Sequence, residues 1–312
     1  MSLLVLSVPS YAALAEGIAV ALNEQSESPE PAAEMGSVER RVFTDGEVYQ
    51  RITREVRGRD VVLVAGTPTE SDTLQAFDLA CAVARYGAAS LTWVLPYFGC
   101  QTMERAVRPG EVVTAKTRAR LISAVPSPPG GMRVLLLDLH TAGLPHYFGD
   151  SLNAFHLYAK PLVLEAALEF GGDDFVLASP DAGRAKWVQS LANDLRVPAA
   201  FIYKRRHGSG MVEVTGVNAA VKGKRVVIYD DMIRTGGTLL QAARAYLEAG
   251  AERCYAVTTH LVVPGDAAAT LMASDELSGI AGTDSHPRSR VAAAAGCDVR
   301  SVAPVFAEWL KA

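Results

Sequence analysis

The stretch Val226–Leu240 carries residue types whose spacing suits the binding of a phosphate group. The apolar run Val226–Tyr229 leads into Asp230 and Asp231, and a Thr-Gly-Gly-Thr sequence at 235–238 follows before a helical pattern begins. This order predicts a buried strand, a tight loop and the start of a helix. Paired glycines let the backbone approach a ligand closely, and the free N–H groups at a helix start favour an anion.

Asp230 and Asp231 stand at the end of the predicted strand, beside the expected phosphate position. Carboxylates there can accept hydrogen bonds from vicinal sugar hydroxyls or hold a magnesium-bound water. A lone TGGT sequence occurs in many α/β loops, but a hydrophobic strand running into Asp-Asp and then TGGT is much more specific. The loop holds neither a Walker A pattern nor a GxGxxG fingerprint, which argues against a standard nucleotide P-loop and a dinucleotide fold. We therefore expect a pocket for a phosphorylated sugar.

The composition is that of a globular protein long enough for two domains of ordinary size. The chain has 312 residues, of which 49% are hydrophobic and 21% are charged. Its formal net charge of −4 counts against nucleic-acid binding, because no basic excess is present to neutralise a phosphate backbone. No apolar run approaches the length of a membrane span, so no membrane association is expected. The four cysteines lie far apart without a CxxC pair, which indicates a reducing cytoplasm.

Strand-like apolar runs recur along the chain with helical segments between them. This alternation predicts a mostly parallel sheet covered by helices on both faces. The predicted strands are Val61–Ala65, Leu91–Leu95, Val134–Leu137, Phe175–Ala178, Ala199–Tyr203, Val226–Tyr229 and Cys254–Thr258, with a further strand at Leu3–Val8.

Two segments look like copies of one strand–loop–helix unit. The run Val61–Val64 is followed by Thr73-Leu74 and a helical pattern, just as Val226–Tyr229 is followed by Thr238-Leu239. The first copy has Glu-Ser-Asp at 70–72 where the second has Thr-Gly-Gly, and its two acids would repel a phosphate. A common skeleton of this kind also arises by chance. If the likeness reflects a duplication, the chain holds two related α/β domains, and only the C-terminal one keeps a phosphate loop.

Further motifs resemble those of the ribose-phosphate diphosphokinases, the family of phosphoribosyl-diphosphate (PRPP) synthetases. The loop at 226–240 alone resembles the PRPP motif that this family shares with type I phosphoribosyltransferases. The other motifs extend the resemblance over nearly the whole chain, from Phe43 to the tail at Ser301–Leu310. They are FTDGE at 43–47, PYFG at 96–99, LDLH at 137–140, ASPDAG at 178–183 and KRR at 204–206.

The resemblance implies an α/β fold of two tandem phosphoribosyltransferase-like domains, each a mostly parallel sheet flanked by helices. Residues 1–152 are expected to form an ATP-side domain with a degenerate phosphate loop, on which the tail 300–312 packs. Residues 153–299 are expected to form the domain that carries the ribose 5-phosphate loop.

The activity that the resemblance implies is that of a ribose-phosphate pyrophosphokinase. Such an enzyme transfers the β,γ-diphosphoryl group of ATP to the C1 hydroxyl of ribose 5-phosphate, giving PRPP and AMP. Its expected cofactor is Mg²⁺. The expected assembly is a cytoplasmic homo-oligomer, based on dimers and extending to a hexamer.

The same resemblance assigns site residues by their positions. Lys204 and Arg206, in a mobile loop through about Glu213, are expected to close over the phosphates as catalytic residues, and His140 and Asp181 match magnesium-site residues. The expected ribose 5-phosphate residues are Asp230, Asp231, Arg234, Thr235, Gly236, Gly237 and Thr238. The expected ATP residues, partly completed by a neighbouring subunit, are Phe43, Asp45, Gly46, Glu47, Thr102, Met103 and Glu104.

Several of these residues also have a plain structural interpretation. A KRR run is usually a solvated surface cluster, and a histidine after a strand is usually a hydrogen-bonded structural residue. Asp181 after Ser-Pro can be a helix N-cap, and the DGE sequence can be a turn. Magnesium prefers oxygen ligands, which counts against His140. The remaining histidines show no zinc-type spacing and are expected to be structural: His146, His156, His207, His260 and His286.

Some positions depart from the pattern of the family that the chain resembles. Thr102 and Met103 stand where the family has an arginine and a glutamine that contact ATP, which leaves the donor specificity open. Arg234 stands where an aspartate often precedes TGGT, and Pro-Gly-Glu at 109–111 replaces a basic sequence of the regulatory site. Two other functions therefore stay open, a non-catalytic homologue that regulates an active synthetase and a base phosphoribosyltransferase.

Overall fold

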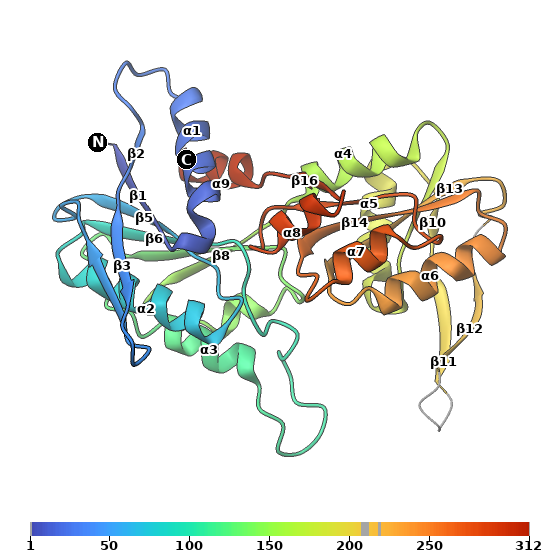
Figure 1. The fold of residues 1–312 in the computed structure, drawn as a ribbon, viewed down its shortest axis with the longest axis horizontal. Coiled ribbons are helices and arrows are strands. Elements are labelled where there is room, and N and C mark those ends of the chain that lie inside the picture. The colour runs from blue at the N-terminus through green and yellow to red at the C-terminus, as the bar shows by residue number, and fades with distance from the viewer. Residues whose placement is uncertain (1, 207–211, 218–219, 312) are drawn as a thin grey trace. The chain divides into compact units, whose positions relative to one another are not determined.

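The computed structural model of the chain divides it into two compact units, shown in Figure 1. Unit 1 comprises Met1–Tyr158 and Ser301–Ala312, and unit 2 comprises Ala159–Arg300. The structure describes residues 2–206, 212–217 and 220–311, and between 203 and 217 it describes the backbone only.

Unit 1 is built on a six-stranded sheet in which every neighbouring pair of strands is parallel. The strand order is β2-β1-β5-β6-β7-β8. The central strands are continuous apolar runs, as expected for a parallel sheet that is covered on both faces. The strands are β1 (Leu3–Ser7), β2 (Ala33–Met35), β5 (Asp60–Val64), β6 (Ser90–Leu95), β7 (Met132–Leu137) and β8 (Asn153–Leu157).

Helices cover both faces of the unit 1 sheet, as Figure 1 shows. On one side lie α1 (Ala12–Glu24) and α9 (Ala303–Lys311), which pack against each other, so the C-terminal tail belongs to this unit. On the other side lie α2 (Glu70–Arg85) and α3 (Thr114–Ile122). The N-terminal segment is thus a strand and a buried helix, with Leu14, Ile18 and Leu22 on the buried face of α1. Short 3₁₀ turns occur at Pro9–Tyr11 and Leu144–Tyr147.

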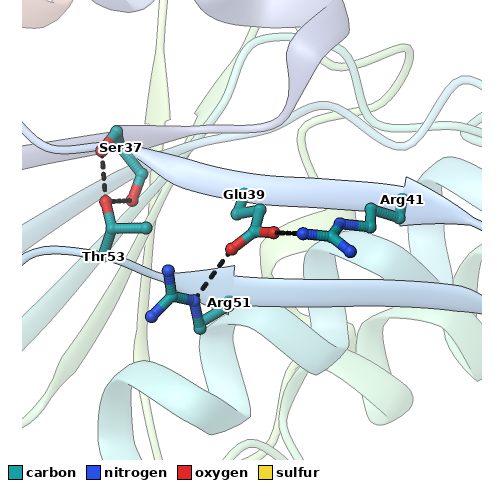
Figure 2. A network of polar contacts seen from close by, with 5 residues as sticks. All are labelled: Ser37, Glu39, Arg41, Arg51 and Thr53. Atoms are coloured by element: carbon teal, nitrogen blue, oxygen red, sulfur yellow. Dashed lines mark hydrogen bonds and ion pairs between the residues drawn. The ribbon is translucent and has the colours of Figure 1, made fainter.

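A two-stranded antiparallel hairpin, β3 (Val38–Val42) and β4 (Val48–Ile52), stands beside the sheet of unit 1. Figure 2 shows the polar contacts that hold its strands together. Glu39 accepts hydrogen bonds from Arg41 (2.5 Å) and Arg51 (2.9 Å), and these bonds, that from Arg51 first, lower the pKa of the Glu39 carboxyl. The Thr53 hydroxyl bonds Ser37 at the base of the hairpin. The bonds from Arg51 to Glu39 and from Thr53 to Ser37 therefore join the two sides of the hairpin.

Unit 2 repeats this topology with a second parallel sheet, in the order β10-β9-β13-β14-β15-β16. Leaving the hairpin strands aside, both sheets have the order 2-1-3-4-5-6 when their strands are numbered along the chain. Unit 2 also has its hairpin between the second and third strands, formed by β11 (Ile202–Arg206) and β12 (Val212–Val217). The strands of the sheet are β9 (Phe175–Ala178), β10 (Ala199–Ala200), β13 (Arg225–Ile233), β14 (Arg253–Leu261), β15 (Ile280–Thr283) and β16 (Asp298–Arg300).

The alternation of side chains along β13 divides the core of unit 2 into two clusters. Val227 and Tyr229 face one side, where α4 and α5 supply apolar residues such as Val163 and Leu191. Val226 and Ile228 face the opposite side, which is covered by the remaining helices. The helices are α4 (Lys160–Gly171), α5 (Ala185–Leu195), α6 (Gly237–Glu248), α7 (Ala267–Met272) and α8 (Ser289–Ala294), with a 3₁₀ turn at Ala182–Arg184.

The predicted α/β architecture with two related parallel-sheet domains is confirmed, and the differences lie at strand ends. The predicted strand Ala199–Tyr203 is divided between β10 and β11, and the segment expected to be a loop after it forms the hairpin. The strand predicted at Val226–Tyr229 continues to Ile233, because β14 keeps pairing with it beyond the last residue of β9. In the described part of the chain, no helix combines the length and apolarity that crossing a membrane requires.

Candidate active site

The predicted sugar-binding acids of unit 2, Asp230 and Asp231, lie toward the carboxyl end of β13, beside the carboxyl end of β9. The pairing of β13 with β9 ends at Ile228, whereas its pairing with β14 continues to Ile233. Asp230 and Asp231 therefore lie just past the end of β9. This is the point where the strand order of the sheet reverses, and ligands of open α/β sheets bind at such points.

The predicted phosphate loop leads directly into α6. Gly236 is the N-cap and has a φ of 77°, in the left-handed region that favours glycine. A Cβ there would lie 2.3 Å from a methyl group of Leu271, so both the backbone and the packing require glycine. At Gly237, the first residue of α6, nothing lies within 4 Å of a Cβ position, and Thr235 and Thr238 are exposed. The start of the helix is open, and its first-turn N–H groups have no acceptors within the helix.

The two adjacent acids have different electrostatic environments. Asp231 is buried, and its Oδ2 accepts a hydrogen bond from Nη2 of Arg184 in an ion pair. Asp230 is partly buried, and its Oδ1 accepts from the backbone N–H of Asp231 (3.0 Å). Burial, followed by the charge of Asp231, raises the pKa of Asp230 to about 8. The sequence pattern gave no signal for Arg184.

Asp181 lies on the turn that follows β9, in the same unit. Its Oδ1 accepts from the N–H of Gly183 (2.8 Å), while its charge contributes to the raised pKa of Asp230. The N-cap of α5 is Arg184, so Asp181 is not the N-cap of that helix. Within the described residues, neither Asp181 nor Asp230 forms an ion pair.

In unit 1, the carboxyl ends of β6 and β7 carry the LDLH motif and the residues aligned with the ATP position. Two residues here, Cys100 (φ 61°) and Asp138 (φ 36°), have left-handed backbones. Strained conformations of this kind persist only where the surroundings hold them, and they gather at functional sites. The two loops are joined by Gln101, whose Oε1 accepts from the N–H of His140 (2.8 Å).

Gln101 and His156 are the site residues of unit 1 that sequence reasoning missed. Gln101 is fully buried, and its Nε2 finds no acceptor among the described residues, which is a costly arrangement. The Nε2 of His156 accepts from the N–H of Leu139 (2.9 Å). The two side chains thus fix the backbone at Leu139 and at His140 itself. The only sequence signal for Gln101 and His156 was that each is a polar residue among apolar neighbours.

The segment Thr102–Glu104 forms the turn after Gln101. Met103 is 42% exposed, and its N–H donates to the carbonyl of Cys100 (2.8 Å). The hydroxyl of Tyr147 donates to the carbonyl of Glu104 (2.6 Å). The turn is fixed by hydrogen bonds to backbone carbonyls. It exposes the apolar side chain of Met103 at the position where the family has a glutamine.

The FTDGE motif forms the turn of the β3–β4 hairpin. The N–H of Glu47 donates to Oδ1 of Asp45 (3.0 Å), and Gly46 has a φ of 93°. Phe43 is 50% exposed and makes an edge contact with Tyr49. The structural interpretation as a turn is confirmed, and the role in ATP binding stays a prediction. The side chains of Lys204 and Arg206 lie outside the described residues, so their catalytic role also stays a prediction.

Comparison with known proteins adds an independent line of evidence. The family model for the N-terminal domain of ribose phosphate pyrophosphokinase matches residues 3–125, and the phosphoribosyl transferase domain model matches residues 158–278. The chain is 36% identical over 269 residues to the ribose-phosphate pyrophosphokinase of Caldanaerobacter subterraneus subsp. tengcongensis, covering 85% of this chain and 83% of that one. The chain belongs to the ribose-phosphate pyrophosphokinase family.

Two further relatives of this pyrophosphokinase agree with that assignment. The ribose-phosphate pyrophosphokinase of Gloeobacter violaceus is 39% identical over 230 residues, covering 73% of this chain and 68% of that one. The crystal structure of phosphoribosylpyrophosphate synthetase from Mycobacterium smegmatis matches with a TM-score of 0.85 at 27% identity, covering 100% of this chain and 98% of that one. The predicted family and the predicted tandem fold are thereby confirmed.

The metal assignment within this pyrophosphokinase stays a prediction. Among the residues that the structure describes, no group of three or more His, Cys, Asp or Glu side chains is arranged to hold a metal ion. His140 belongs to unit 1 and Asp181 to unit 2.

Proposed function

We propose that this pyrophosphokinase transfers the β,γ-diphosphoryl group of ATP to the C1 hydroxyl of ribose 5-phosphate, giving PRPP and AMP. The observation that carries the proposal is the open start of α6, which lies directly after the acid pair of β13. A helix start supplies N–H donors and a favourable dipole to an anion. Carboxylates beside it suit the hydroxyls of the attached sugar.

In this proposal the loop of unit 2 holds ribose 5-phosphate. The 5-phosphate lies against the backbone of Thr235–Thr238, with Arg234 adding positive charge nearby. The acid pair at Asp230 and Asp231 orients the ribose, so that its C1 hydroxyl faces the β-phosphorus of the donor. A bond forms between O1 and the β-phosphorus while the bond from that phosphorus to the α-phosphate bridging oxygen breaks, so that AMP leaves with this oxygen and the proton of the C1 hydroxyl is released to solvent. Protein groups have little covalent work in such a transfer, so alignment and charge neutralisation dominate.

Mg²⁺ fits the residues at this edge of unit 2. Asp181, which the motif resemblance assigns to the metal together with His140, is an oxygen donor of the kind that Mg²⁺ prefers, and it forms no ion pair with another described residue. Mg²⁺ usually binds through one or two carboxylates together with substrate phosphates, which agrees with the small number of protein ligands here. When bound, the ion would neutralise charge on the transferring group.

The donor nucleotide is assigned to unit 1 and to the β3–β4 turn. Thr102, Met103 and Glu104 would contact it from the end of β6, with His140 at the end of β7. Phe43, Asp45, Gly46 and Glu47 would contact a donor bound to a neighbouring subunit, which requires a homo-oligomer. Lys204 and Arg206 would approach the phosphates from the other hairpin and exclude water. Four free thiols are compatible with a cytoplasmic location.

The direct test incubates the purified protein with ATP, Mg²⁺ and ribose 5-phosphate and follows the products by ³¹P NMR. We expect AMP and PRPP in equal amounts. A parallel screen with GTP, CTP and ADP shows whether Thr102 and Met103 have changed the donor preference. If no nucleotide gives PRPP, the proposed function is wrong.

Thr102 and Met103 favour one alternative function, that of a non-catalytic homologue that regulates an active synthetase. Neither residue can replace the cation and the amide that the family pattern places there. The alternative predicts that the protein turns over no donor, yet co-purifies with an active synthetase and changes its rate. Turnover by the isolated protein would exclude it.

A further inference from the structure

Arg184 is a built-in partner of one of the two acids of the proposed sugar site. Its Nη2 donates to Oδ2 of Asp231, and the two side chains are only 17% and 6% exposed. A buried ion pair is held together by the high cost of leaving either charge alone. One of the two adjacent carboxylates is therefore already neutralised by the protein.

Asp230 forms no ion pair with any described residue. Burial, followed by the charge of Asp231, raises its pKa, and the charge of Arg184 only partly opposes this. Of the two acids, it is also the more accessible. The pair is therefore unequal. Asp231 belongs to a protein ion pair, and Asp230 remains for a ligand.

The turn that carries Arg184 is fixed to the phosphate-loop helix. The hydroxyl of Ser179 donates to the carbonyl of Asp181 (2.5 Å), and the N–H of Gly183 donates to Oδ1 of Asp181 (2.8 Å). The hydroxyl of Tyr246, a fully buried residue of α6, donates to the carbonyl of Ser179 (3.0 Å). Hydrogen bonds thus connect the helix that would bind the phosphate to the turn that positions Arg184.

We propose that Arg184 is a positioning residue for the sugar phosphate, which holds the Asp231 side chain in place through their ion pair so that Asp230 is the carboxylate that meets the ribose hydroxyls. This inference rests on the proposed function, because it names ribose 5-phosphate as the ligand. Arg184 acts through Asp231 and does not itself touch the substrate. Its removal should therefore matter only while residue 231 is the aspartate with which it pairs.

The test is a double-mutant cycle of Arg184→Met and Asp231→Asn. Calorimetry measures ribose 5-phosphate binding without a nucleotide, and steady-state kinetics give separate KM values for ribose 5-phosphate and ATP. We expect Arg184→Met to weaken the binding of ribose 5-phosphate by at least about tenfold, because it leaves a buried charge unpaired. The KM for ATP should change by less than about threefold, and Arg184→Lys should restore most of the binding because it returns the charge. The double variant should bind ribose 5-phosphate as well as Asp231→Asn alone does.

Each contrary result overturns the inference. Unchanged binding by Arg184→Met, equal losses for both substrates, or a further loss on the Asp231→Asn background would show that Arg184 has no such role or contacts a substrate directly. If Arg184→Met does not fold, the double variant carries the test, since it buries no unpaired charge and must bind as Asp231→Asn does. Failure of the wild-type protein to bind ribose 5-phosphate overturns the proposed function as well, which distinguishes the two failures.

Discussion

The two units share one topology but differ at the helix that follows the third strand of each sheet. In unit 2, α6 begins at Gly237 after an open loop. In unit 1, α2 begins after Thr69, whose side chain accepts from the N–H of Asp72 (3.1 Å). Glu70 and Asp72 in the first turn of α2 also complement the helix dipole. The start of α2 is thus satisfied by its own side chains, whereas the start of α6 is left for a ligand.

The ends of the first strands differ in the same way. After β1, Tyr11 is 2% exposed, and a Cβ at Gly66 would lie 2.0 Å from its hydroxyl oxygen. The ring therefore fills the space at the carboxyl ends of β1 and β5. After β9, the corresponding segment carries Asp181 and Arg184 instead. Two units of one topology thus differ at the same strand ends: unit 1 fills the space with a side chain of its own, whereas unit 2 places Asp181 and Arg184 there.

The largest expected effect concerns the hairpin of unit 2. Lys204→Ala should lower turnover by about 10³-fold, because a cation that arrives over the transferring phosphates stabilises charge in the transition state. The matched control is Lys224→Ala, which removes the same charge beside the amino end of β13, where Lys224 pairs with Asp174 (2.7 Å). An exposed pair of this kind contributes little. Near-full activity in Lys204→Ala would show that the assignment of this hairpin is wrong.

Tyr11 tests whether a side chain fills the space at the strand ends of unit 1. Tyr11→Ala should lower the free energy of unfolding by about 3 kcal/mol, because the lost ring leaves a cavity in the core. Tyr11→Phe keeps the ring and should lower the free energy of unfolding by less. Urea unfolding of the three proteins measures the difference. If Tyr11→Ala is as stable as Tyr11→Phe, the ring does not serve as a filler, and the comparison between the strand ends fails.

A substitution at Gly237 can make the helix start of unit 2 acidic, like that of unit 1. Gly237→Asp places a carboxylate where unit 1 has Asp72, and the open space around the Cβ position lets the fold accept it. The KM for ribose 5-phosphate should rise by about 100-fold, since a negative charge now lies where the phosphate docks. Gly237→Asn is the uncharged control of the same shape. Equal KM values for the two variants, measured in the same assay, would contradict a phosphate at this helix start.

Much of this comparison could be read from the sequence, because its signals were local. The TGGT loop, the acids before it and the Glu-Ser-Asp counterpart predicted which unit keeps an open helix start. The family assignment also followed from motif order. Strand limits were less predictable, because β13 extends to Ile233 only through its pairing with β14.

Arg184, Gln101 and Tyr11 could not have been assigned from sequence. Each acts on a residue distant in the chain: Arg184 on Asp231, Gln101 on His140 and Tyr11 on Gly66. Such pairs are set by the packing of strand ends against each other. A single sequence holds no periodic or spacing signal for them.

The smallest expected effect concerns two histidines at matching positions, after the fifth strand of each sheet. In unit 1 Asp-Leu-His ends at the partly exposed His140, and in unit 2 Asp-Ser-His ends at the buried His286. Burial, followed by the charges of His260 and Arg288, lowers the pKa of His286 to about 3. The neutral ring is therefore favoured in the folded state. Its contribution to stability is complete above a pH of about 6.5 and is lost as the pH falls from there toward 3.

Within this window, the free energy of unfolding should fall by up to about 1.4 kcal/mol per pH unit on account of His286. In the wild-type protein, Nδ1 of His286 accepts a hydrogen bond from the N–H of Arg288 (3.1 Å). His286→Asn keeps an acceptor for this N–H, but the asparagine side chain cannot be protonated. Urea unfolding between pH 7.5 and 4.5, an assay window set about the ordinary histidine pKa, should therefore show a flatter profile for His286→Asn than for the wild-type protein. His140→Asn is the matched control at the corresponding position of unit 1, and it should keep the wild-type slope because it leaves His286 in place. Equal slopes in all three proteins would contradict the role of His286 in this pH dependence.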